Sequence, residues 1–373
     1  MIVERKNKTG TSYIARVYDR KTKRQIYSKT YRTRREAVKA EAKLIEGSTR
    51  PKKIPTCQEM FELWLTYARP SYAERTWKGH EYYWNHYVAP IFGRFRADEV
   101  LPDKILKFKA GIENRRQNKS QSGKSGYSAE TINKIVSVLS LVFAFGRDVL
   151  GVIETSPMDH IKRNRVMQVK HPTWTQEEIR SFLVSPAVLS SYFRPMLILA
   201  FTTGMRPGEI CGLAESDLLP QHVLTISRGI NYYGHLTELK TARSHRAISL
   251  SEPLYEMLFE VRQDKKQKDL PRTNDFLFVG PLGAPITPNV LSAAFHKLLD
   301  EYNRTNAPLP VISLYGARHS FATNLIMSGK KSLLISEIMG NSVATMEYHY
   351  AHLRETMHAA ALEEYSKELL PDG

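Results

Sequence analysis

The sequence predicts a multidomain protein that is mainly helical and contains small β-sheets. Three observations support this. The chain has 373 residues, which exceeds one average domain of ~100–200 residues. Capping boxes, in which Thr is followed three residues later by Glu, open helical patterns at Thr33, Thr56 and Thr175. Two stretches rich in Pro, Gly and basic residues, GSTRPKKIP and HIKRNRVMQVKHP, separate these regions as linkers.

The first region, residues 1–50, is predicted to form a small sheet with one helix. Residues 11–31 are rich in Tyr, Ile, Val and Thr and contain a basic turn at 19–23, which favours two paired strands. The capping box at Thr33 and Glu36 starts a helix whose apolar residues recur until Gly47 ends it.

The second region, residues 55–160, is predicted to form a four-helix domain. Apolar residues at three- and four-residue spacing place helices at about 57–69, 73–89, 102–117 and 129–149. The second helix interleaves basic and aromatic residues: Trp77, Lys78, Tyr82, Tyr83, Trp84 and Tyr87. Packing in the helical core is the commoner use of such rings. Contact with bases and phosphates is the alternative.

The third region, residues 172–373, mixes helices with a strand-rich stretch. Helices are predicted at 176–184, 192–203, 207–214 and 252–263, with strands within 222–250. Four more helical pieces follow up to the C-terminus. The region is therefore expected to be of the mixed α+β class.

The charge distribution points to a polyanionic partner. The formal net charge is +16, and residues 1–53 hold 17 Lys and Arg against 5 Asp and Glu. Such a basic segment suits nucleic acid, because neutralised phosphates release counterions. An anionic membrane is the competing partner, but it would favour a basic amphipathic helix with bulky apolar residues, which is not evident.

Cysteine usage and hydropathy indicate a cytoplasmic protein. Cys57 and Cys211 show neither CxxC spacing nor neighbouring His clusters, so a disulfide framework and a zinc site are not expected. No uncharged apolar run approaches the ~20 residues that span a bilayer, and the N-terminus is charged.

Four segments in the third region carry a recognisable pattern. They are FTTGMRPGEICGL, LKTARSHRAISL, SLYGARHSFATNL and IMGNSVATMEYHYAHL. By contrast, no HExxH, P-loop, GxSxG or GxGxxG motif occurs in a convincing context, which gives little support to a metalloprotease, NTPase, hydrolase or dinucleotide enzyme.

Through these segments the chain resembles the tyrosine recombinase family, especially the three-domain integrases of temperate phages and conjugative transposons. Matched position by position, the first Arg of the family pattern is Arg206, the hairpin Lys is Lys240, the second Arg is Arg318 and the nucleophile is Tyr350. Two positions depart from the pattern. Tyr315 replaces the usual HxxR histidine, and Asn341, nine residues before Tyr350, replaces a His or Trp.

Each of these elements has a simpler interpretation on its own. Arg206 and Glu209 could form a structural ion pair, a hairpin lysine is usually solvated, and a single tyrosine usually packs in a core or interface. Four elements in the family order make coincidence improbable.

The resemblance implies a covalent mechanism. Paired guanidiniums neutralise a phosphodiester as its transition state forms. Tyr350 would attack to give a 3′-phosphotyrosine link, with Lys240 protonating the leaving 5′-oxygen. The link conserves the energy of the broken bond, so neither metal nor any other cofactor is expected. Tyr315 and Asn341 can donate hydrogen bonds to phosphate but lack the imidazole's acid–base chemistry, so slower cleavage is expected. His319, His349 and His352 could compensate or simply pack.

The resemblance also assigns the other regions. Residues 1–50 would be an arm-type DNA-binding domain with a three-stranded sheet in the major groove, 55–160 the core-binding domain and 172–373 the catalytic domain. Candidate DNA-contacting residues are Arg16, Tyr18, Arg24, Lys29, Arg32 and Lys78. The C-terminal stretch would form a helix that docks on a neighbouring protomer or packs on its own domain, with one apolar stripe of Leu353, Met357, Ala361, Tyr365 and Leu369.

We therefore expect an integrase of a mobile element that acts on double-stranded DNA as a homotetramer, on the nucleoid in the bacterial cytoplasm. Its further partners would be an excision factor and a host DNA-bending protein. Two alternatives stay open. One is an integrase-derived DNA-binding protein whose catalysis is impaired at Tyr315 and Asn341, and the other is a topoisomerase IB-like resolving enzyme.

Overall fold

The computed structural model describes residues 2–7, 10–18, 25–40, 54–114, 127–166, 172–239, 242–267, 275–280 and 283–350. The chain divides into two compact units, Met1–Met167 and Gln168–Gly373. The three domain boundaries expected from the sequence stay a prediction. Arg24, Lys240 and the expected C-terminal helix lie outside the described residues.

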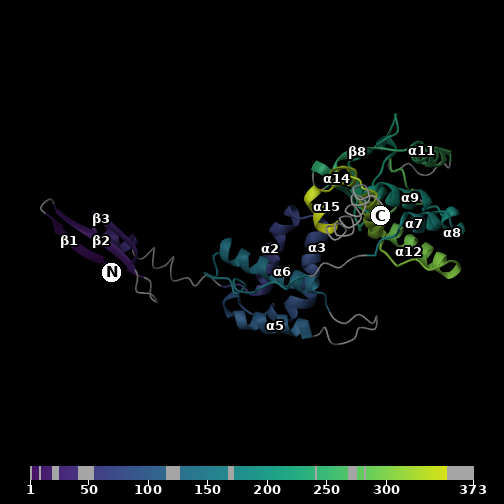
Figure 1. Ribbon diagram of the computed structural model, residues 1–373. Helices are drawn as coiled ribbons and strands as arrows, with labels where there is room; N and C mark the ends of the chain where they lie inside the picture. The colour runs from purple at the N-terminus through teal and green to yellow at the C-terminus, as the bar shows by residue number, and fades with distance from the viewer. Residues whose placement is uncertain are drawn as a thin grey trace, which may run out of the picture. The chain divides into compact units, whose positions relative to one another are not determined.

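The first unit begins with an antiparallel sheet of three strands in the order β1-β2-β3 (Figure 1). The strands are β1 (Ile2–Asn7), β2 (Gly10–Tyr18) and β3 (Gln25–Tyr31). Residues 34–40 follow as a helix, and Thr33 and Glu36 exchange backbone-to-side-chain hydrogen bonds of 3.3 Å at its start. The three-stranded sheet is as the family resemblance implies, with one strand more than the residue pattern alone predicted.

The helical part of the first unit is built around α6 (Ala129–Asp148), which contacts α2 (Cys57–Ser71), α3 (Glu74–Tyr83) and α5 (Pro102–Asn114) (Figure 1). By length and composition α6 could cross a membrane. Its apolar side chains, however, are buried in the helical core with Trp84, which stacks on Phe61 at a centroid distance of 4.4 Å. The helix is therefore accounted for as the core helix of a folded domain.

The predicted helix at 73–89 is interrupted. After α3 the chain forms a π-helical turn, η1 (Trp84–Val88), and then α4 (Ala89–Phe92). Pro90 has no N–H to give to the helix, which disfavours a regular α-helical continuation there. The rings of Trp77, Tyr83 and Tyr87 pack against the core, whereas Tyr82 is exposed. Most of the aromatic residues singled out in this helix thus serve packing.

The second unit combines helices with two small sheets. Its first helices are α7 (Gln176–Leu183), α8 (Pro186–Leu189), α9 (Arg194–Thr203) and α10 (Pro207–Cys211). Strands β4 (Leu218–Leu219), β5 (Val223–Ile226) and β8 (Arg246–Ser249) form one antiparallel sheet, and β6 (Arg228–Ile230) pairs with β7 (Leu236–Glu238). The short helix α8 was not predicted, because Pro186 opens only a single turn.

Five helices complete the described part of this unit: α11 (Glu252–Gln267), α12 (Pro288–Thr305), α13 (Leu314–Met327), α14 (Ser332–Met339) and α15 (Val343–Tyr350). Helical pieces predicted after α11 are thus present as far as Tyr350, and the one expected at the C-terminus lies outside the described residues. The main core gathers around Trp174, which stacks on Phe201 at 5.3 Å. A second, smaller core joins α13, α14 and α15 and contains Phe321, Met346 and Tyr350. These helices bring the conspicuous motifs of the sequence together.

Candidate active site

The turn between α9 and α10 positions the first arginine. Gly204 ends α9 in the left-handed conformation, at φ 61°, which glycine adopts without steric cost. Arg206 then caps α10, where its backbone N–H donates to Oε2 of Glu209 at 3.0 Å and its Nη1 lies 2.6 Å from Oε1. The structural ion pair expected as the simpler reading of this motif therefore exists, and it holds the Arg206 side chain in one orientation.

Glu209 is shared with a third arginine, Arg246, at the start of β8. Nη2 of Arg246 lies 2.9 Å from Oε2 of Glu209, and the Arg246 guanidinium also donates to the backbone oxygens of Ile338 at 2.6 Å and Ser244 at 3.1 Å. Burial by itself would raise the pKa of Glu209, but the adjacent Arg246 and Arg206 outweigh it and hold that pKa below its usual range. Glu209 is therefore a buried carboxylate anion between two cations.

The second motif arginine, Arg318, lies in α13 and is 1% exposed. Its Nη1 donates to the backbone oxygen of Gly204, and its Nη2 donates to the backbone oxygen of Met339 at 2.9 Å. Burial, together with the positive charge of Arg206, lowers the pKa of Arg318 to about 10. The guanidinium therefore stays charged at neutral pH.

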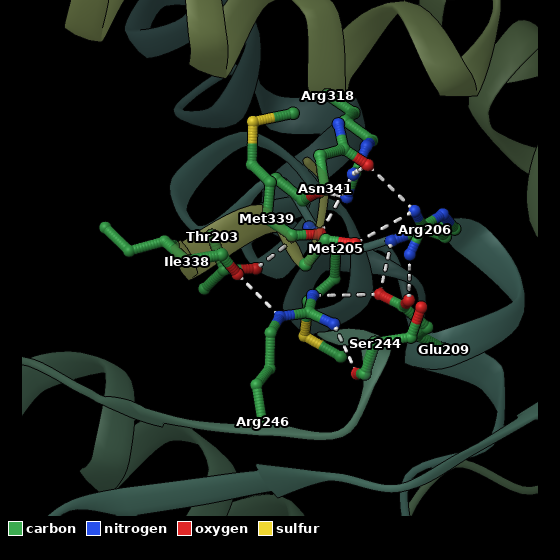
Figure 2. A network of polar contacts seen from close by, with 12 residues as sticks. Thr203, Met205, Arg206, Glu209, Ser244, Arg246, Arg318, Ile338, Met339 and Asn341 are labelled. Carbon is green, nitrogen blue, oxygen red and sulfur yellow. Dashed lines mark hydrogen bonds and ion pairs between the residues drawn. The ribbon is translucent and has the colours of Figure 1, made fainter. Parts of the chain in front are cut away.

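Asn341 joins the two arginines (Figure 2). Its Oδ1 accepts a hydrogen bond from Nη2 of Arg206 at 2.9 Å and another from Nη2 of Arg318 at 2.7 Å. Its amide nitrogen lies 3.8 Å from Sδ of Met346, and its backbone N–H donates to Ser336 at 2.9 Å. Two guanidiniums, one from the residue that caps α10 and one from α13, thus converge on a single neutral oxygen.

Tyr350 ends the described chain at the C-terminus of α15 and is 7% exposed. Its hydroxyl oxygen lies 2.8 Å from Nδ1 of His319 in α13. Burial raises the pKa of this phenol above its ordinary value, the charge of Arg318 opposes that increase, and Tyr315 adds to it. The phenol therefore keeps its proton at neutral pH.

Tyr315 is 44% exposed, and its ring contacts that of His319 at a centroid distance of 5.4 Å. The structure thus gathers Arg206, Arg318 and Asn341 into one hydrogen-bonded cluster. Tyr315 and Tyr350 both contact His319. Lys240 falls between β7 and β8, outside the described residues.

The DNA-contact candidates are spread more widely. In the β-sheet register Arg16 pairs with Ser28, whereas Lys29 pairs with Ala15. Neighbouring residues of a strand point to opposite faces, so Arg16 and Lys29 lie on opposite faces of this sheet. Lys29 and Arg32 are exposed, and of Tyr18 only the backbone is described. Lys78 lies 2.7 Å from Glu74 on its own helix.

Three residues of the site were not among the predicted catalytic residues, although the sequence had offered His319 as a possible compensating histidine and Glu209 as an ion-pair partner of Arg206. Arg246 and Glu209 belong to it through buried contacts that no spacing reveals, although Glu209 lies within the first arginine motif. His319 follows Arg318 directly and lies one helical turn after Tyr315, which was the available signal. Within the described ranges, no group of three or more His, Cys, Asp and Glu side chains could hold a metal ion.

The fold and this cluster define a class of protein: an enzyme with a buried tyrosine beside paired arginines that suit an anionic substrate. Comparison with known proteins is more specific. Residues 173–357 match the phage integrase family. The chain is 23% identical to the ICEBs1 integrase of Bacillus subtilis over 336 residues, 86% of each chain, and 26% identical to the transposase from transposon Tn916 of Enterococcus faecalis over 297 residues, 72% of each.

Solved structures agree in fold. The Tn1549 transposon integrase in complex with a circular intermediate DNA matches with a TM-score of 0.67 at 21% identity, over 83% of this chain and 99% of that one. A lambda integrase tetramer bound to a Holliday junction matches with a TM-score of 0.56 at 15% identity, over 91% and 95%. The chain belongs to the phage integrase family of tyrosine recombinases, enzymes that cleave and rejoin DNA strands.

Proposed function

We propose that this recombinase integrates and excises a mobile element by cutting DNA at specific sites through a 3′-phosphotyrosine link on Tyr350. The observation that carries the proposal is the convergence of Arg206 and Arg318 on one oxygen, at 2.9 and 2.7 Å. Asn341 supplies that oxygen in the free protein. A scissile phosphate offers anionic oxygens to the same donors, and charge-assisted hydrogen bonds of this kind are about twice as strong as neutral ones.

The remaining residues would complete the reaction. Tyr350 attacks the phosphorus, and Lys240 gives a proton to the leaving 5′-oxygen. Arg206 and Arg318 offset the charge of the pentacoordinate transition state. Asn341 would then turn its amide N–H groups to the phosphate, and Tyr315 would donate its hydroxyl.

The proposal extends to the rest of the chain. Residues 1–50 would bind the arm-type DNA sites. Residues 55–160 would bind the core DNA site together with the catalytic domain, residues 172–373. Four copies of the chain would exchange DNA strands through a Holliday junction. The protein would act on the nucleoid in a bacterial cytoplasm, with an excision factor and a host DNA-bending protein. The similarity to the ICEBs1 integrase and to the transposase from transposon Tn916 supports the role in moving a mobile element.

A covalent-adduct assay tests the proposed chemistry. The protein is incubated with a nicked duplex carrying DNA that flanks its gene, and adducts are counted on a denaturing gel. We expect an adduct with the parent, none with Tyr350→Phe, and a parental amount with Tyr348→Phe, because Tyr348, two residues earlier on α15, is 63% exposed. Absence of adduct with the parent, while DNA binding persists, would instead support the impaired DNA-binding protein. One observation favours that alternative: in the free protein Asn341 accepts a hydrogen bond from Arg318, whereas catalysis would need it to donate one to the phosphate.

A deletion separates the integrase from a topoisomerase-like resolving enzyme. Removal of residues 1–53 takes away 17 Lys and Arg and would remove the second DNA contact of a two-site integrase. Integration should be abolished, while cleavage of core DNA persists. If integration survives, the two-site arrangement is wrong.

A further inference from the structure

The nucleophile must lose a proton, and the structure points to the group that takes it. The hydroxyl oxygen of Tyr350 lies 2.8 Å from Nδ1 of His319. Because burial keeps the phenol protonated at neutral pH, its O–H is available as a donor to this nitrogen. Nδ1 can accept only in the neutral tautomer of imidazole that carries its proton on Nε2. The contact therefore already has the geometry of a proton transfer.

His349 is a second imidazole near Tyr350, with its ring centroid 6.5 Å from that of the phenol, but it is Nδ1 of His319 that lies within hydrogen-bond distance of the hydroxyl oxygen. The remaining groups around Tyr350 cannot take this proton. Arg318 and Tyr315 are the groups whose charges act on the phenol. A guanidinium is already protonated at neutral pH, and a second phenol is no stronger a base than the first. Asn341 has an amide, which does not titrate. Among the described side chains that contact the phenol, only imidazoles accept a proton near neutral pH, and His319 is the imidazole that is hydrogen-bonded to the hydroxyl.

On the basis of the proposed function, we infer that His319 is the general base of the cleavage step and the general acid of the rejoining step. In cleavage the O–H bond of Tyr350 breaks and its proton moves to Nδ1. The phenolic oxygen bonds to phosphorus, and the bond from phosphorus to the 5′-oxygen breaks. In rejoining the 5′-hydroxyl attacks phosphorus and gives back to Lys240 the proton that this oxygen received in cleavage. The bond from phosphorus to the phenolic oxygen breaks, and the imidazolium returns its proton to that oxygen. This role moves the acid–base chemistry from the motif position held by Tyr315 to the next turn of α13.

The alternative role is a packing or orienting hydrogen bond. Substitution by Asn distinguishes the two, because its amide reaches the place of Nδ1 and keeps a hydrogen bond but cannot accept the proton. His319→Gln is a second amide variant with a longer reach. His349→Asn is the matched control, because His349 is exposed on α15 and its ring lies 6.3 Å from that of His319.

The experiment measures single-turnover adduct formation by the full chain on two nicked duplexes. One has the ordinary scissile phosphate, and the other has sulfur in place of the leaving 5′-oxygen. A thiol has a pKa of ~8.5, so a thiolate leaves without a general acid. His319→Asn and His319→Gln should be slower than the parent by about 10²-fold or more on both duplexes, while His349→Asn matches the parent. Thermal melting and DNA binding report whether each variant is folded.

Three outcomes would overturn the inference. A folded His319→Asn or His319→Gln variant within about threefold of the parent rate would show an orienting role, well short of the ~10²-fold that proton transfer contributes. If the variants cleave the ordinary duplex slowly but the sulfur-containing duplex at the parental rate, His319 acts on the leaving group instead. If both amide variants fail to fold, the contact is structural. Absence of adduct with the parent itself would contradict the proposed function, and is therefore distinguishable from all three.

Discussion

Nη2 of Arg318 lies 2.7 Å from Oδ1 of Asn341, which ties the second arginine of the site to the residue that replaces the usual His or Trp. The same oxygen accepts from Arg206. An amide at this position therefore orients both guanidiniums before substrate arrives, a role that a ring nitrogen serving as a hydrogen-bond donor would not fill. Asn341, which departs from the family pattern, therefore has a structural role. Replacing its neutral amide by a charged carboxylate tests this role.

Asn341→Asp should change activity and stability in opposite directions. A carboxylate of the same shape would bind both arginines more strongly than the amide does, raising the free energy of unfolding by ~1 kcal/mol. It would also repel the phosphate, so adduct formation should fall by about 10²-fold or more. Chemical denaturation and the adduct assay measure the two effects. If Asn341→Asp neither gains stability nor loses activity, the oxygen at this position does not orient the arginines.

Arg246→Lys should destabilise the second unit, although it preserves the charge. The guanidinium contacts Glu209 and two backbone oxygens, and one ammonium group cannot reproduce that fork. We expect a loss of ~1–3 kcal/mol in the free energy of unfolding, because buried acceptors lose their hydrogen-bond donors while the charge is kept. Arg243→Lys is the control, since Arg243 is exposed and should change stability by less than ~0.5 kcal/mol. Equal effects of the two substitutions would contradict the account.

Glu209 should contribute stability that depends on pH. Its pKa is lower in the folded protein than the ordinary ~4.3. A lowered carboxyl pKa stabilises the fold above the unfolded-state pKa, and this contribution is lost as pH falls through the folded-state pKa. Glu209→Gln should therefore be less stable than the parent at pH 7 by ~1–3 kcal/mol, and the difference should narrow upon acidification below about pH 4. Denaturation curves recorded across pH measure this difference in the free energy of unfolding. A difference that stays constant with pH would contradict the lowered pKa of Glu209.

Gly204→Ala should disturb the site through the backbone. A Cβ atom there would lie 2.5 Å from Cδ1 of Phe321, at a residue with φ of 61°. Gly329→Ala shares the positive φ, 73°, but its Cβ would meet nothing within 4 Å. In the control the free energy of unfolding should fall by ~1 kcal/mol because of the left-handed conformation. In Gly204→Ala it should fall by ~1–3 kcal/mol more because of the clash. Equal losses in thermal unfolding would mean that the contact with Phe321 relaxes freely.

The sequence predicted helices well where a local signal sets them. The capping boxes at Thr56 and Thr175 both form as expected, and each starts its helix one residue later. The π-helical turn after Tyr83 was missed, because periodicity continues through it and only Pro90 marks the interruption. Arg206, Arg318 and Asn341 do meet in space, as their motif order suggested. The roles of Arg246 and His319 depend on contacts between distant segments, which residue spacing along one helix cannot show.

Localising the covalent link tests the central claim most directly. The adduct is digested with nuclease and trypsin, and fragment-ion mass spectrometry locates the nucleotide that remains on the protein. The tryptic peptide 332–354 contains both Tyr348 and Tyr350, so fragmentation must separate them, whereas Tyr315 falls in the peptide 305–318. We predict that the nucleotide is on Tyr350. A nucleotide on Tyr348 or Tyr315 would contradict the assignment of the nucleophile and, with it, the role given to His319.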